Sequence, residues 1–178
     1  MKILKNALMF LAVIVLLAGC KKELGVATFD VDSQSTFTIQ GGGGILNLLE
    51  IVTPGVQTNW EGDFANNNTN KDQLREMHLT DLTLTITNPA GQTFDFLENI
   101  HIFIKADGLQ ETEIAYKENI PTTIGQTLKL DAKDIDLTQY AKKDAFTLRV
   151  TAKQRKTISQ DVTMRADMIF KVTADVLK

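Results

Sequence analysis

The sequence predicts an all-β protein, an antiparallel β-sandwich of about 8–10 strands with one short connector helix. The first observation behind this prediction is the segment Val162–Val176, in which every even-numbered residue is apolar. The second is the similar alternation over Phe146–Ala152. Alternation with a period of two places successive side chains on opposite faces, as in a strand with one buried face. The third is the lack of room for the helices that join parallel strands.

The segment 162–176 is long for one strand, because strands usually have about 3–10 residues. We therefore expect a bend or a bulge that lets this segment contribute to two sheets. The neighbouring segment 146–152 is close in sequence, and we expect the two to form a hairpin across residues 156–160.

A change of side-chain phase predicts a β-bulge in the middle of the chain. Met77 and Leu79 are apolar at odd positions, whereas Leu82 and Leu84 are apolar at even positions. One extra residue near Thr80 would produce this shift.

The remaining elements follow from turn signals and short apolar segments. Asn88–Gly91 contains a proline and a glycine and predicts a turn. Residues 136–143 predict the short helix, with Asp136 as its cap. Further strands are expected at Ala27–Val31, Phe37–Gln40, Ile45–Ile51, Ile100–Lys105, Glu113–Tyr116 and Thr127–Leu130.

The first nineteen residues have the pattern of a secretory signal peptide. Lys2 and Lys5 supply the positive charge, and Ala7–Ala18 is an uncharged apolar stretch. This stretch is too short to cross a bilayer as a helix, which needs about 20 residues. It ends at Gly19 and Cys20, and Cys20 is the single cysteine of the chain.

Residues 17–20, with the sequence LAGC, resemble the lipobox of bacterial lipoproteins. The resemblance implies cleavage between Gly19 and Cys20, a diacylglyceryl group on the sulfur of Cys20 and acylation of the new amine. It divides the chain into a signal peptide at 1–19, a lipid-anchored tether at 20–26 and a single sandwich domain at 27–178. In strand rhythm, that domain resembles the immunoglobulin-like or jelly-roll sandwiches of small envelope lipoproteins.

The residue after the cysteine bears on location in such lipoproteins. An aspartate there favours the inner membrane, so Lys21 implies the outer membrane. The acidic cluster of surface-exported lipoproteins is missing, which favours the periplasmic face over the cell surface. The net charge of −3 makes nucleic acid a poor partner.

Nothing in the sequence indicates an enzyme, a metal site or a cofactor. His78 and His101 lie in separate segments without the spacing of metal ligands. Cys20 is committed to lipid, and no serine stands in a G-x-S-x-G motif. The aspartates that lie close together in sequence do not follow the calcium-loop pattern, and turns or helix caps explain them.

Two loop features remain. Gly41–Gly44 predicts a flexible break or a close backbone approach rather than a phosphate loop. Residues 59–73 form a long polar loop, and its candidate binding residues are Trp60, Phe64, Asn66, Asn67 and Asn68.

Two interpretations of this loop are open. In one, at least one aromatic ring is exposed and anchors a partner; in the other, Trp60 closes the end of the core. We expect a non-catalytic, lipid-anchored envelope module that presents its loops to a protein partner. The alternative is a carbohydrate-binding lipoprotein, in which Trp60 stacks on a sugar ring.

The lipid anchor gives the first testable prediction. Replacing Cys20 by serine removes the sulfur nucleophile, so Cys20→Ser is expected to abolish fatty-acid labelling and release the protein from membranes. Metabolic labelling followed by membrane fractionation measures both effects. Labelling that persists in the variant would contradict the lipobox interpretation.

Overall fold

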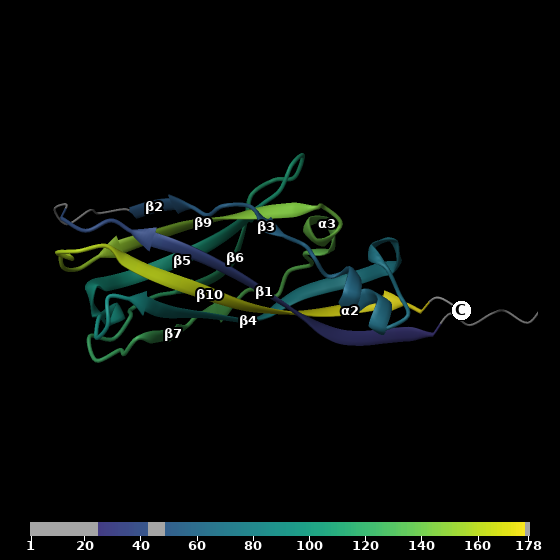
Figure 1. Ribbon diagram of the computed structural model, residues 1–178, viewed down its shortest axis with the longest axis horizontal. Coiled ribbons are helices and arrows are strands. Elements are labelled where there is room, and N and C mark those ends of the chain that lie inside the picture. The colour runs from purple at the N-terminus through teal and green to yellow at the C-terminus, as the bar shows by residue number, and fades with distance from the viewer. Residues whose placement is uncertain (1–24, 43–48, 177–178) are drawn as a thin grey trace, which may run out of the picture.

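The computed structural model describes residues 25–42 and 49–176. The predicted signal peptide, the lipidation site at Cys20 and Lys21 lie outside the described residues, as does most of the predicted strand Ile45–Ile51. Two antiparallel sheets form the fold (Figure 1). The first contains, in spatial order, β1 (Val26–Ile39), β10 (Val162–Asp175), β4 (Leu74–Asn88) and β7 (Thr127–Lys129).

The second sheet has six strands, and two of them lie one after the other along the same edge of its long strand β9. In spatial order its members are β2 (Leu49–Val52) and β3 (Val56–Gln57), then β9 (Ala145–Gln154), β5 (Leu97–Lys105), β6 (Thr112–Lys117) and β8 (Asp131–Ala132). Most connections between successive strands cross from one sheet to the other. This confirms the all-β sandwich, and its topology is that of a jelly roll rather than an immunoglobulin domain.

The alternation in the sequence corresponds to the buried and exposed faces of the strands. In β10 the seven even-numbered residues from Val162 to Ala174 are all buried, and they share the core-facing side of the first sheet. The pairing of β10 with β4 shifts register between Ile169 and Phe170, opposite Asp81 and Leu79. The extra residue between Asp81 and Leu79 is Thr80, so the predicted bulge is confirmed.

Two predictions about strand pairing are wrong. The segments 146–152 and 162–176 do not form a hairpin, because β9 pairs with β2, β3 and β5, whereas β10 pairs with β1 and β4. Strand β10 also stays in one sheet along its whole length (Figure 1). Each strand has one apolar face, and these two faces pack against each other across the core instead of pairing edge to edge.

Strand β1 also differs from expectation. The sequence predicts separate strands at Ala27–Val31 and Phe37–Gln40, yet β1 runs without interruption through the polar residues between them. It pairs with β10 over its whole length without a register shift. The predicted strands at Ile100–Lys105, Glu113–Tyr116 and Thr127–Leu130 and the turn at Asn88–Gly91 are confirmed.

Two short helices lie toward the same end of the sandwich (Figure 1). The predicted one is α3 (Thr138–Ala141), and the Asp136 carboxylate accepts a hydrogen bond from the Thr138 backbone N–H at 2.9 Å. The other, α2 (Glu61–Asn66), lies in the segment predicted to be a loop, so the expectation of a single helix is wrong. Single 3₁₀ turns occur at η1 (Lys71–Gln73) and η2 (Phe94–Phe96). Among the described residues, no helix has the length and apolar character needed to cross a membrane.

Gly41 confirms the predicted close backbone approach, since a Cβ atom there would lie 2.3 Å from the Gln160 backbone. Its N–H donates to the Asp161 carboxylate at 2.9 Å. Gly42 has a φ of +78°, which glycine adopts without strain. Gly43 and Gly44 lie outside the described residues.

The register of β10 yields the second prediction. Phe170 is buried in the core and Lys171 beside it is exposed. Phe170→Ala is therefore expected to lower the free energy of unfolding by about 3–5 kcal/mol, because it leaves a cavity, while Lys171→Ala should change it by less than about 0.5 kcal/mol. Denaturant unfolding measures both values. Equal losses in the two variants would show that the register is wrong.

Candidate functional site: a polar groove at one edge of the sandwich

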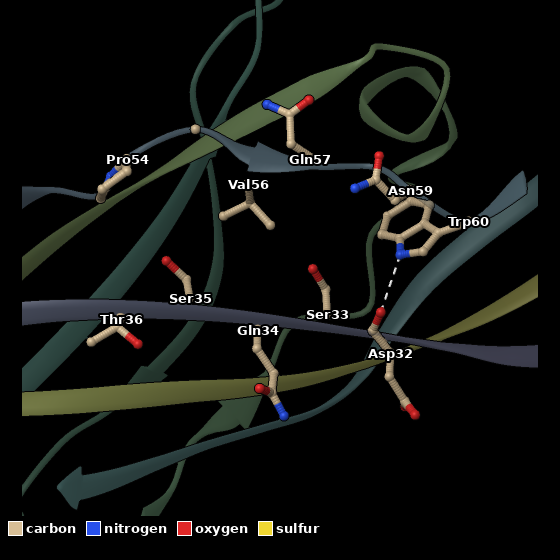
Figure 2. Close-up of a pocket in the computed structure, with 11 residues that line it drawn as sticks. Asp32, Ser33, Gln34, Ser35, Thr36, Pro54, Val56, Gln57, Asn59 and Trp60 are labelled. Atoms are coloured by element: carbon tan, nitrogen blue, oxygen red, sulfur yellow. Dashed lines mark hydrogen bonds between the residues drawn. The ribbon is translucent and has the colours of Figure 1, made fainter.

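A groove of about 510 Å³ lies between strand β1 of the first sheet and the segment that carries β3 in the second (Figure 2). Its two walls come from distant parts of the chain. The lining residues are Asp32, Ser33, Gln34, Ser35, Thr36, Pro54, Gly55, Val56, Gln57, Asn59 and Trp60. Most of these side chains carry hydrogen-bonding groups.

Strand β1 forms one wall with an unusual core-facing side. Val31 and Phe37 are buried on that side, and the two positions between them on the same face are Ser33 and Ser35. In Figure 2 both hydroxyls point toward the β3 segment, whereas the Gln34 side chain points away from it. Neither serine hydroxyl has a hydrogen-bond partner among the described residues.

Two buried threonines hold the other wall in place. The Thr53 backbone N–H donates to the Leu148 carbonyl oxygen at 2.8 Å, and the Thr53 hydroxyl accepts from the Leu148 N–H at 3.0 Å. At the other end, the Thr58 hydroxyl donates to the Lys143 carbonyl oxygen at 2.6 Å. The segment between Thr53 and Thr58 is thereby held against β9 at one end and against the residues just before β9 at the other. Its opposite edge faces the groove.

Trp60 closes one end of the groove and is only 3 % exposed. Its ring centroid lies 5.6 Å from that of Phe170 and 6.4 Å from that of Phe146. Its indole N–H donates to the carbonyl oxygen of Asp32 at 3.1 Å (Figure 2). Phe64 is 1 % exposed and packs edge-on against Phe29. The hypothesis that one ring is exposed is therefore wrong, and the interpretation of Trp60 as a core residue is confirmed.

The three predicted asparagines do not line the groove. Asn66 ends α2, and the Asn67 side chain donates to the Asp63 carbonyl oxygen at 2.8 Å. Asn68 has a φ of +52°, a left-handed conformation that asparagine tolerates better than most residues. These residues terminate the helix and turn the chain.

A second hollow, of about 580 Å³, lies over the β5–β6 connection and the start of β9. Two of its charged groups pair with each other: the Arg149 guanidinium donates to Glu111 at 2.8 Å and stacks 4.3 Å from the Phe103 ring centroid. The hydrogen bond from Arg149 lowers the pKa of Glu111, against the raising effect of burial. Lys105 and Asp107 also line this hollow.

The histidines are held by carboxylates at the protein surface. His101 lies 2.5 Å from Glu113 through Nδ1 and 3.1 Å from Glu118 through Nε2. Burial raises the pKa of Glu113, but hydrogen bonds from Lys133 and His101 outweigh burial, and the pKa is lower than usual. His78 Nδ1 lies 2.9 Å from Asp134.

No group of three or more histidine, cysteine, aspartate or glutamate side chains in the described segments could hold a metal ion. Two acidic side chains outside the groove form ion pairs: Asp131 pairs with Lys117 and Asp95 with Lys156. The groove lining contains no histidine, lysine or cysteine. Its chemistry is hydrogen bonding to hydroxyl, amide and backbone groups.

The sequence reasoning did not find Ser33, Ser35, Thr53 or Thr58. The serines were detectable, because they continue the alternation that Val31 begins and place polar groups on the buried face. Nothing in the sequence marks the two threonines, because their role depends on contacts with Lys143 and Leu148, which lie about 90 residues later in the chain.

Comparisons with known proteins were made at the level of sequence and structure. No family model matches the chain, and no curated protein matches it. A capsid structure of Helicobacter pylori bacteriophage KHP30 is similar at 9 % identity and a TM-score of 0.38, over 86 % of this chain and 100 % of that one. The decameric BFDV capsid protein has 12 % identity and a TM-score of 0.37, over 84 % and 99 % of the two chains.

A third similar structure is the Yersinia pseudotuberculosis-derived mitogen, with 14 % identity and a TM-score of 0.28. It covers 86 % of this chain and 87 % of its own. All three TM-scores lie below 0.5, so nothing about the function of this chain is argued from them.

The packing of Trp60 yields the third prediction. Trp60→Ala is expected to lower the free energy of unfolding by about 3–5 kcal/mol, because the ring fills the space between Phe146 and Phe170. Gln57→Ala, on the exposed wall of the same groove, should change it by less than about 0.5 kcal/mol. Thermal unfolding followed by circular dichroism compares them. An unchanged melting temperature in Trp60→Ala would contradict this role.

Proposed function

We propose that this chain is a lipid-anchored, non-catalytic binding or assembly module of the cell envelope, and that it holds a protein partner in the groove between β1 and β3. The LAGC motif supports the anchor at Cys20, and Lys21 favours the outer membrane. The lack of an acidic cluster after Cys20 favours its periplasmic face. The sequence alone predicts recognition by the loop at residues 59–73, whereas the geometry favours the groove at the sandwich edge.

The observation that carries the proposal is the pair of core-facing serines, Ser33 and Ser35, on the β1 wall of the groove. A polar side chain on a buried strand face weakens packing unless its hydroxyl is hydrogen-bonded. Apolar residues at positions 33 and 35 would extend the core and leave a smaller, drier groove. Ser33 and Ser35 instead keep the groove polar, which suits a binding surface.

The anchor and the groove work together in this function. Residues 20–26 would span at most about 25 Å when fully extended. A tether of this length keeps the groove close to the membrane surface. It raises the local concentration of partners in the same compartment, so modest intrinsic affinity is sufficient. Two or three acyl chains are enough for stable anchoring.

Carbohydrate binding at Trp60 receives no support from the geometry. Stacking on a sugar requires an exposed aromatic face, and the Trp60 ring is packed against Phe146 and Phe170. The groove lining contains no other aromatic residue. A protein partner is therefore the better assignment.

Photo-crosslinking in intact cells tests the proposed function and is the fourth prediction. A photoreactive amino acid at Gln57, on the groove wall, is expected to give crosslinks to an envelope protein. The same amino acid at Thr127, exposed on β7 at the opposite edge of the first sheet, serves as the matched control and should give no such product. Crosslinks from neither position, or equally from both, would contradict recognition at the groove.

A further inference from the structure

We propose that the partner binds as an extended segment that adds a strand to the free edge of β1, pairing with the backbone of Gln34 and Thr36. This inference deepens the proposed function and rests on it, because it specifies how the groove recognises a protein. The occupant is an extended peptide segment of another protein, with a lysine or arginine side chain placed beside Asp32.

The direction in which the N–H and C=O groups of alternate β1 residues point supports this mode of binding. In an antiparallel pair, residues alternate between those that hydrogen-bond the neighbouring strand and those whose N–H and C=O groups point away from it. The Asp32 carbonyl oxygen points away from β10, because it accepts the Trp60 indole N–H. The backbone groups of Thr38 also point away from β10. Its hydroxyl lies 3.0 Å from that of its partner Thr163, and cross-strand side chains approach this closely at pairs that do not exchange backbone hydrogen bonds.

Gln34 and Thr36 lie between these two positions at the same spacing of two residues. Their backbone N–H and C=O groups therefore point toward the open edge of β1. Within the described part of the chain, β1 pairs with β10 alone, and no backbone hydrogen bond joins Gln34 or Thr36 to another segment. An extended peptide would satisfy these four groups at once.

Strand β1 lacks several of the features that normally protect an edge strand. Its 14 residues contain no proline, glycine or lysine, and its pairing with β10 shows no bulge. Its charged residues, Asp30 and Asp32, precede the stretch Ser33–Thr38, which carries no charge. By contrast β7, the other edge of the same sheet, has only three residues. A long and regular edge is a template for pairing with another chain.

The surroundings of this edge define the occupant. Ser33 and Ser35 are small, which leaves space beneath an added strand, and Trp60 closes one end. Asp32 is exposed at the groove and forms no ion pair with a cationic side chain among the described residues. A basic side chain on the partner would complement it.

Proline and alanine substitutions at Gln34 provide a matched test. Proline at an edge position whose N–H points outward is tolerated by a sheet, so Gln34→Pro removes the donor offered to the partner and keeps the pairing with β10. Gln34→Ala removes the side chain and keeps the donor. With the photoreactive amino acid at Gln57 in the full chain, Gln34→Pro is expected to reduce the crosslinked product about tenfold, while Gln34→Ala retains it.

The other outcomes are equally informative. If both variants keep the product, the edge is not used, and the proposed function stands without strand addition. If both lose it, the partner recognises the Gln34 side chain, and the inference is overturned. A product that joins two copies of this chain would overturn the assignment to another protein. Failure of the unsubstituted chain to crosslink from Gln57 instead counts against the proposed function itself.

Amide hydrogen exchange of the purified lipoprotein in detergent covers the case in which Gln34→Pro does not fold. The amides of Gln34 and Thr36 are expected to exchange at least about a hundredfold faster than those of Ser33 and Ser35, which point to β10. Protection of all four amides in the absence of a partner would show that the edge is already paired and would overturn the inference.

Discussion

The contact among Trp60, Phe146 and Phe170 is the constraint on which the arrangement of this molecule depends. Phe170 belongs to β10 in the first sheet and Phe146 to β9 in the second, so their edge-on contact joins the sheets. Trp60 packs against both rings and bonds the backbone of Asp32 on β1. Aromatic pairs of this kind contribute about 0.5–1.5 kcal/mol beyond the burial of their surface. The cluster thereby sets the position of the groove relative to the core.

The groove interrupts the usual strand pattern next to that cluster. Ser33 and Ser35 occupy positions on the core-facing side of β1 where apolar residues are expected. Proteins depart from such rules mainly at functional sites, where the loss of stability is compensated elsewhere. The aromatic cluster and the threonine hydrogen bonds of the opposite wall stabilise the structure around the groove.

The charged residues of the sandwich contribute mainly to its structure. Glu113 lies between Lys133 and His101, Glu111 pairs with Arg149, and each carboxylate has a pKa below its usual value. Such half-exposed pairs contribute little individually to stability. Each of these carboxylates has an oppositely charged partner, whereas Asp32 at the groove forms no ion pair among the described residues.

The sequence by itself determined which face of each strand is buried, the bulge at Thr80 and the all-β class, because these follow from the spacing of apolar residues along the chain. For Gly41–Gly44 it offered either a flexible break or a close backbone approach, and the structure shows the close approach at Gly41. The tertiary structure alone decided that β9 and β10 lie in different sheets and that β1 is one continuous strand. It also decided that Trp60 is buried and that a groove forms beside it. Alternation specifies a face, whereas the choice of partner strand depends on contacts between residues far apart in the sequence.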